Sequence, residues 1–399
     1  MQRRAFTGLI VSLAGGTILS PLGSNAQEYK EEIGKQANTG LPANLPDNLK
    51  QMVSNTVKID FQDVNTDWDG TIRIEGLLRF SQRGYREGLT YASNWFNYHL
   101  KNDAKLDDEA YFNQYDGPRA RILRDGPLTF VIYSSVLNLA CPVHELYKQT
   151  GNKVAKEVCL DVAEAIVHYV ARDKYGMMAH DDKNFTNFTI PDTAYYAVRA
   201  TAIASSLTKG DLSKVYLKQS VYQLDLAINH FFDKDKNLSR LGIFDNKSST
   251  IYWCRSQGWL MWSIAGLLRY IPTSHSYYTK AATTFAALAN GVKKYQTKNG
   301  GLHVYVDDPS TPEDVTSIAM VIAVVKEGMR KGWLPKEYND MCDKGWQYIQ
   351  KSVDADGKVH NAYTGWALTA HQGQKDLMDT KFRGFAVGIL MLAADEMTR

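Results

Sequence analysis

Helical periodicity is the feature of this sequence that most constrains its fold. Apolar residues recur at spacings of three and four in one segment after another, which is typical of helices that bury one face. No stretch shows the convincing apolar and polar alternation of a half-buried strand. The predicted helices span residues 71–80, 87–100, 128–147, 154–170, 194–207, 215–232, 258–270, 278–295, 317–329, 338–353 and 382–397. The sequence therefore predicts an all-α protein.

The connections between these helices alternate in character. Short polar turns such as Thr150-Gly151-Asn152 follow some helices, while longer segments rich in aromatics and carboxylates, such as 173–191 and 300–316, follow others. Antiparallel helical hairpins repeated around a closed ring would produce this alternation. Segments 128–139 and 317–325 are apolar nearly all round, as expected of helices inside such a ring. A functional site is expected on the face with the longer loops.

Residues 1–26 have the pattern of a secretory signal peptide. Arg3 and Arg4 precede a short apolar run and the small residues that end at Ala26. The run is too short to span a membrane, and no later stretch is apolar enough to do so. A twin-arginine route and the general export route both fit, so the protein is expected to be periplasmic or secreted. Residues 27–50 are predicted to be an N-terminal tail, and residues 51–399 a single domain.

Composition excludes several classes of protein. A formal charge of +3 over 399 residues, without a basic stripe, argues against nucleic acid as a partner. The four cysteines lack CxxC spacing, which favours buried free thiols over a disulfide. His180 precedes two aspartates, but nothing completes a ligand set, so neither a metal nor a cofactor is expected. Aromatic residues make up 11% of the chain, which fits sugar binding and also ordinary core packing.

Two aspartates precede or open predicted helices, and each has two interpretations. Asp125 stands before Gly126-Pro127, and Asp192 follows Pro191. Either side chain would cap a helix, with Thr189 and Asp192 forming a capping box. Alternatively, they are a pair of carboxylates that carry acid–base chemistry.

The start of the predicted helix at 258–270 carries a second group of candidates. Arg255 would hold a carboxylate in a bidentate contact, Gln257 adds an amide, and Trp253 and Trp259 would stack on a sugar ring. A structural salt bridge and core tryptophans are the alternative. His303 belongs to a further loop, residues 301–309, which resembles a site-lining segment or a simple turn before a proline.

Taken in order, these segments resemble glycoside hydrolase family 105, the unsaturated rhamnogalacturonyl hydrolases, and the related unsaturated glucuronyl hydrolases of family 88. The resemblance covers residues 68–397 and is most specific over 301–333. The matching motifs are Val306-Asp307-Asp308-Pro309, Thr316-Ser317-Ile318-Ala319-Met320, Lys326-Glu327-Gly328, Gly332-Trp333-Leu334, the Asp-rich stretch 354–360 and the segment 381–386. The resemblance implies an (α/α)6 barrel.

Carried over by position, Asp192 matches the family's catalytic aspartate and Asp125 its second aspartate. The segment from Arg255 to Trp259 is similar to an arginine-glycine-asparagine-glycine-tryptophan motif, with Ser256 and Gln257 as departures. His180 falls near a family histidine. The resemblance thus implies that Arg255, Trp253, Gln257, Trp259, His180 and His303 surround an oligosaccharide with a terminal unsaturated uronate.

The reaction that the resemblance implies is hydration of an enol ether. Asp192 would protonate C4 of a 4,5-unsaturated uronic acid at the non-reducing end, and water would add to C5. The hemiketal would then open and release the neighbouring sugar. Two alternatives stay open at this point: a hydrolase or lyase of a saturated uronic-acid-containing glycan on the same barrel, and a non-catalytic glycan-binding protein. The sequence does not predict the oligomeric state.

Overall fold

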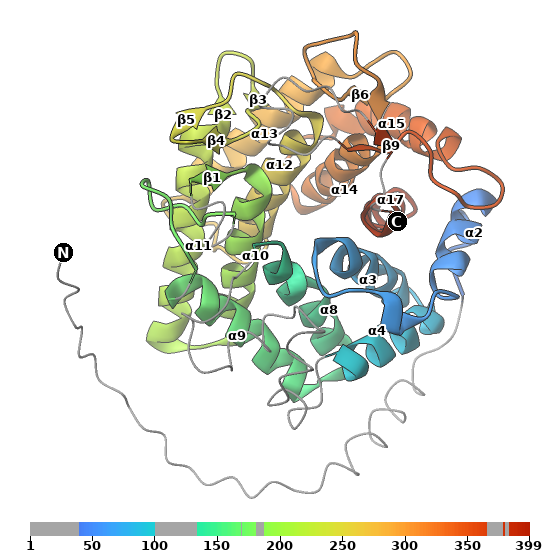
Figure 1. Ribbon diagram of the computed structural model, residues 1–399, viewed down its shortest axis with the longest axis horizontal. Coiled ribbons are helices and arrows are strands. Elements are labelled where there is room, and N and C mark those ends of the chain that lie inside the picture. Colours follow the sequence, from blue (N-terminus) through green and yellow to red (C-terminus); the bar gives the residue numbers. More distant parts are fainter. Residues whose placement is uncertain (1–39, 100–133, 169, 181–186, 365–377, 380–382) are drawn as a thin grey trace, which may run out of the picture. The chain divides into compact units, whose positions relative to one another are not determined.

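The computed structural model describes residues 40–99, 134–168, 170–180, 187–364, 378–379 and 383–399 (Figure 1). Residues 1–26, predicted to be a signal peptide, and Asp125 lie outside the described residues. The segment Ala37–Arg399 forms one compact unit. Its α-helices are α2 (Asp47–Thr56), α3 (Trp68–Ser81), α4 (Arg86–His99), α8 (Ala140–Thr150), α9 (Lys153–His168), α10 (Pro191–Leu207), α11 (Gly210–Phe231), α12 (Cys254–Leu268), α13 (Tyr278–Tyr295), α14 (Val315–Lys331), α15 (Asn339–Lys351) and α17 (Arg383–Met397).

Six of these helices form a closed inner ring. In chain order α3, α8, α10, α12, α14 and α17 each pack on the next, and α17 packs back on α3 (Figure 1). The helices that alternate with them, α2, α4, α9, α11, α13 and α15, lie outside this ring. The arrangement is an (α/α)6 barrel, so the predicted fold class is confirmed.

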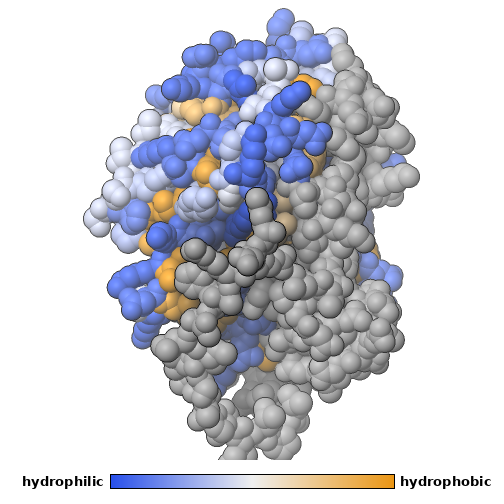
Figure 2. Space-filling view, turned by 60° about the vertical axis from the view of Figure 1, so that its left-hand side comes forward, coloured by the Kyte–Doolittle hydropathy of each residue, from blue (hydrophilic) through white to orange (hydrophobic). Residues whose placement is uncertain are grey.

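Burial follows the same division into an inner and an outer ring. All fifteen residues of α12 are buried, whereas the outer helix α15 buries only five of its thirteen. Outer helices thus need one apolar stripe and inner helices need apolar or internally paired residues all round. Hydrophilic residues dominate the coloured part of the surface in Figure 2, with small groups of hydrophobic residues scattered among them.

Close backbone contact closes the ring between α3 and α17. A Cβ atom at Gly388 would lie 2.6 Å from the backbone nitrogen of Arg73, so no larger residue fits without moving one of the helices. Nearby, the Asp69 carboxylate accepts the backbone N–H of Phe385 at 2.7 Å. The first and last inner helices are therefore fixed to each other at their N-terminal ends.

The strands are two-residue pairs in the loops, and they form no sheet core among the described residues. Strand β1 (Phe188–Thr189) pairs with β4 (Ile243–Phe244), which pairs with β5 (Lys247–Ser248). The other antiparallel pairs are β2 (Phe232–Asp233) with β3 (Leu238–Ser239), β6 (Leu302–His303) with β7 (Glu313–Asp314), and β8 (Tyr363–Thr364) with β9 (Met378–Asp379). The described residues also include the 3-10 helices η1 (Phe61–Asp63), η2 (Ser134–Leu139) and η3 (Lys336–Tyr338).

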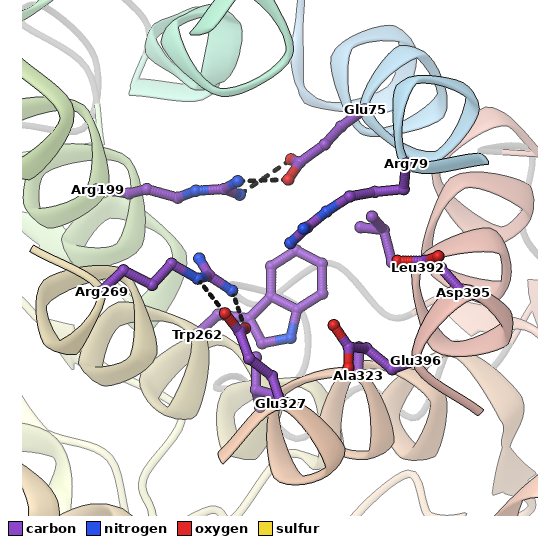
Figure 3. A pocket seen from close by; sticks show the side chains of 11 residues that line it. Glu75, Arg79, Arg199, Trp262, Arg269, Ala323, Glu327, Leu392, Asp395 and Glu396 are labelled. Atoms are coloured by element: carbon purple, nitrogen blue, oxygen red, sulfur yellow. Dashed lines mark hydrogen bonds and ion pairs between the residues drawn. The ribbon is translucent and has the colours of Figure 1, made fainter. Parts of the chain in front are cut away.

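Buried ion pairs join the inner helices toward their C-terminal ends. Arg199 on α10 makes a two-fold contact with Glu75 on α3, and Arg269 makes one with Glu327 on α14 (Figure 3). Arg199 and Glu75 are 4% and 1% exposed. Guanidinium and carboxylate groups thus occupy part of the barrel interior that apolar side chains would otherwise fill.

The four cysteines, Cys141, Cys159, Cys254 and Cys342, are buried and unpaired, as the spacing predicts. Burial raises the pKa of each thiol, so these side chains behave as small apolar groups. Among the described helices, none combines the length and apolar character needed to cross a bilayer.

Candidate active site

The N-terminal ends of the inner helices meet at one end of the barrel. Asp192 begins the first turn of α10, Arg255 the first turn of α12, and Asp314 precedes α14. The charges of Asp192 and Asp314 both act on Arg255, so the three groups lie within electrostatic range of one another. Helix N-termini carry a partial positive charge, so this end of the ring favours a negatively charged ligand.

Asp192 does not cap its helix. Ile190 holds the N-cap position of α10, Pro191 follows it, and no side chain caps the helix. Thr189, the predicted partner in a capping box, donates its hydroxyl to Asp173 at 3.1 Å. The capping interpretation of Asp192 is therefore wrong, because the predicted capping box needs Thr189 at the N-cap position, which Ile190 occupies instead.

The surroundings of Asp192 favour its protonated form. Burial raises the pKa of Asp192 to about 7, although the backbone N–H of Thr193 and the charge of Arg255 act in the opposite direction. The Thr193 N–H donates to Asp192 Oδ1 at 2.9 Å. Desolvation outweighs both effects, as the role of a proton donor near neutral pH requires.

Arg255 is a buried guanidinium without a close carboxylate partner among the described residues. Only 4% of the residue is exposed, and its Nε has no hydrogen-bond partner. The guanidinium carbon lies 4.3 Å from the ring centroid of Trp253 and 5.5 Å from that of Phe385. Burial lowers the pKa of Arg255, and the charges of Asp314 and Asp192 oppose this. A cation held between two rings with unused donors is suited to bind a carboxylate.

Trp259 belongs to an aromatic cluster beneath this group. Its ring stacks on Phe385 with centroids 5.7 Å apart and packs against Tyr195 and Tyr196 at 5.2 and 5.9 Å. Only 3% of Trp259 is exposed. Phe385 covers one face of the indole, and the predicted sugar contact of Trp259 stays a prediction.

The side-chain amide of Gln257 forms hydrogen bonds with the protein's own backbone. Its Oε1 accepts the N–H of Ser239 at 2.6 Å, and its Nε2 donates to the carbonyls of Ser239 and Trp253 at 2.7 and 3.0 Å. These bonds use both ends of the buried amide. The geometry gives Gln257 the role of fixing β3 and Trp253 against α12, and its substrate contact remains untested.

The other predicted residues lie on loops that lead to the same helix ends. Trp253 is 6% exposed, and no described residue pairs with its indole N–H. His180 donates its backbone N–H to Phe188 on β1, the strand that leads to Asp192, and its ring packs edge-on against Phe188. His303 lies on β6, with Nδ1 2.5 Å from the carbonyl of Thr311. Asp125 lies outside the described residues, so its place beside Asp192 is untested.

Asp314 was not predicted as part of the site. It is fully buried, caps α14 through the N–H of Ser317 at 2.7 Å, accepts the Thr316 hydroxyl at 2.6 Å, and accepts the backbone N–H of Tyr363 at 2.8 Å. An aspartate three residues before a serine at the start of an apolar helix is a capping signal in the sequence. That signal identifies the cap but not its position near Arg255, which depends on how α12 and α14 pack.

Chemically, this end of the barrel combines a carboxylic acid that holds its proton near pH 7 with a buried cation. No group of three or more His, Cys, Asp or Glu within the described part of the chain is arranged to hold a metal ion. The described side chains are thus suited to move a proton at an atom next to a bound anion.

Comparison with known proteins places this geometry in a family. The model of Glycosyl Hydrolase Family 88 matches residues 47–399. The unsaturated rhamnogalacturonyl hydrolase YesR of Bacillus subtilis is 24% identical over 256 residues, which cover 62% of this chain and 71% of that protein.

Solved structures show the same fold. A crystal structure described as a possible member of the GH105 family from Salmonella enterica superposes with a TM-score of 0.71 at 17% identity, over 88% of this chain and 92% of that one. A similarly described protein from Klebsiella pneumoniae gives 0.72 at 14% identity over 99% of both chains. Since the family model spans nearly all of the described residues, the chain belongs to Glycosyl Hydrolase Family 88.

Proposed function

We propose that this glycoside hydrolase releases 4,5-unsaturated uronic acid from the non-reducing end of oligosaccharides produced by polysaccharide lyases. The surroundings of Asp192 carry the proposal. Burial raises the pKa of Asp192 to about 7, and this carboxyl group interacts electrostatically with the buried guanidinium of Arg255. A substrate of this class brings a carboxylate and, next to it, a double bond that accepts a proton. The name of the Bacillus subtilis relative supports the same substrate class.

Asp192 acts as acid and then as base in this proposal. It donates its proton to C4, which leaves positive charge shared between C5 and the ring oxygen. A water molecule adds to C5 and returns a proton to Asp192, so the carboxyl group is regenerated. The resulting hemiketal at C5 opens the ring, and the hemiacetal at C1 releases the neighbouring sugar. Asp125 is proposed to bind a sugar hydroxyl and to help keep Asp192 protonated.

Arg255 binds the uronate carboxylate through its unpaired donors. Trp253 covers one side of the guanidinium, so the cation is presented in a fixed orientation. The protein is further proposed to be exported, because residues 1–26 have the charged start, short apolar run and small residues of a signal peptide.

The proposed function is tested with disaccharides that lyases generate from pectin, ulvan and glycosaminoglycans. Turnover is expected to abolish the ultraviolet absorbance of the conjugated double bond in at least one of them. A saturated chromogenic glucuronide is the matched control and should not be hydrolysed. Cleavage of the saturated glycoside alone would contradict the proposal, as would tight binding of all substrates without turnover.

Arg255→Lys is expected to raise KM about tenfold or more and to change kcat less. Lysine keeps the charge but replaces a planar two-pronged contact with a single point charge. Steady-state kinetics on an accepted disaccharide measures both constants. Arg330→Lys, a surface change at the opposite ends of the inner helices, where Arg330 pairs with Glu396, is the control and should leave both constants unchanged. An unchanged KM with a collapsed kcat would assign Arg255 to the transition state instead.

The pH dependence follows from the protonated form of Asp192. Because burial raises its pKa to about 7, kcat/KM should be level below about pH 6 and fall about tenfold per unit above about pH 8. A pH–rate profile at constant ionic strength checks this. Activity that keeps rising to pH 9 would show that the ionised carboxylate, not the acid, is the active form.

A further inference from the structure

A separate pocket lies between α2, α3 and α17 and the loop before β8. Its accessible volume is about 230 Å³. Met52, Ala362, Ala386 and Val387 supply much of its apolar wall, and Arg73 is the one guanidinium among the residues that line it. A pocket with apolar walls and one charged group is the usual form of a small-molecule site.

Arg73, which lines this pocket, carries an unpaired donor among the described residues. Its Nε is buried and has no hydrogen-bond partner within the described part of the chain, and its contact with Asp69 is an ion pair at 3.9 Å without a hydrogen bond. The side chain is 13% exposed. A charged donor that is withdrawn from water and left unpaired is costly, so its presence requires an explanation.

A second unpaired polar atom belongs to the neighbourhood of Arg73. The hydroxyl of Tyr91, a residue that is 6% exposed, has no hydrogen-bond partner among the residues that the structure describes. Burial raises the pKa of Tyr91, and the positive charge of Arg73 opposes this. Tyr91 lines the adjoining hollow, which shares Ile59 with the pocket. Two unsatisfied donors thus lie within electrostatic range of each other, next to open space.

The charges around the pocket limit the kind of anion that fits. Lys358 and Asp356 on the loop are exposed and opposite in sign, so the unbalanced charge among the lining residues is that of Arg73, which Asp69 compensates in part through the ion pair at 3.9 Å. One guanidinium compensates one negative charge. A ligand with two negative charges would keep its second charge unpaired against apolar walls, which is unfavourable. A carboxylate matches the planar guanidinium, and an apolar body attached to it matches the walls.

We propose that this pocket binds a small carboxylic acid with an apolar body, whose carboxylate is held by Arg73. The proposal does not rest on the function proposed above. The pocket lies beside the contact between α3 and α17, whereas Arg255 and Asp192 belong to the N-terminal ends of α12 and α10.

Benzoate is the probe, and benzamide, which has the same shape without the charge, is its control. Calorimetric titration of the full chain is expected to show one benzoate bound and at least tenfold weaker binding of benzamide. Arg73→Gln should weaken benzoate binding at least tenfold. Lys358→Gln removes a positive charge from the exposed loop and should change the affinity less than twofold.

A further variant covers the case in which Arg73→Gln fails to fold. Val387→Phe narrows the pocket without touching Arg73 and should abolish benzoate binding while the melting temperature stays near that of the unchanged protein. The proposal is overturned if benzamide binds as well as benzoate, or if Val387→Phe binds benzoate normally. It is equally overturned if binding is lost in Arg255→Lys and kept in Arg73→Gln, since benzoate would then occupy the proposed uronate site.

Discussion

Asp192→Asn is expected to lower kcat by about 10²- to 10⁴-fold while the protein stays folded. Asparagine has nearly the same size and keeps an oxygen for the Thr193 N–H, but its amide delivers no proton near pH 7. Activity is measured as loss of the double-bond absorbance on a disaccharide that the unchanged enzyme accepts.

The melting temperature of the same variant separates catalysis from structure. Burial raises the pKa of Asp192 from an ordinary 3.8 to about 7, so the folded state holds a proton that the unfolded chain has lost. The stability contributed by that proton is present at low pH and disappears as the pH rises through about 7. The Asn variant should therefore melt no lower than the unchanged protein at pH 5 and higher at pH 8.

Asp125→Asn is the matched control for this experiment. Its proposed role is to bind a hydroxyl and to influence Asp192, so we expect a serious but smaller loss of kcat. Full activity of Asp192→Asn would end the proposed mechanism. A larger loss in Asp125→Asn than in Asp192→Asn would exchange the two roles.

Glu75→Gln is expected to cost about 3–5 kcal/mol of the free energy of unfolding. The change leaves Arg199, which is 4% exposed, as a buried cation without its two-fold partner. For a unit of roughly 360 residues that corresponds to a fall in melting temperature of roughly 4–7 °C. Differential scanning calorimetry or chemical denaturation measures the change.

The double variant Glu75→Gln with Arg199→Met tests the reason for the loss. Removing both charges from a buried pair is often nearly neutral, because neither group then has to be withdrawn from water. We expect the double variant to recover most of the stability lost in Glu75→Gln. If the double variant is less stable than Glu75→Gln alone, the pair contributes through packing or the Tyr195 hydroxyl, which Arg199 also contacts, rather than through charge.

The spacing of apolar residues predicted most of the fold. Inner helices are buried on all sides and outer helices on one side, and each kind of burial leaves its own pattern in the sequence. The predicted helix at 278–295 matches α13, and the one at 194–207 differs from α10 only by its first turn. Helix α2 was not predicted, since the tail was drawn through residue 50 and the polar sequence around Asn48 hides its apolar positions. Asn48 instead bonds the carbonyls of Gln350 and Val353, partners that only the folded chain brings near.

The site was less accessible to sequence reasoning than the fold. Spacing alone favoured a capping role for Asp192, and its catalytic interpretation came from the resemblance to the family. The position of Arg255 near Asp192 depends on the packing of α12 on α10, which periodicity does not specify. Gln257 was predicted to contact the substrate because it lies close to Arg255 in the sequence. In the structure its amide instead forms hydrogen bonds with the backbone of β3.

The contact between α3 and α17 has a consequence for the order in which the barrel is completed. Asp69 and Phe385, which are joined by a hydrogen bond, are 316 positions apart in the chain, and the Asn44 side chain bonds the carbonyl of Thr398 across 354. Contacts between residues so distant in sequence are slow to form, since a long loop must close first. In a ribosome-bound chain that still lacks α17, the faces of α3 and α14 that pack on α17 would be uncovered. Those faces would be open to a second chain, so chaperone protection matters most before the final helix emerges.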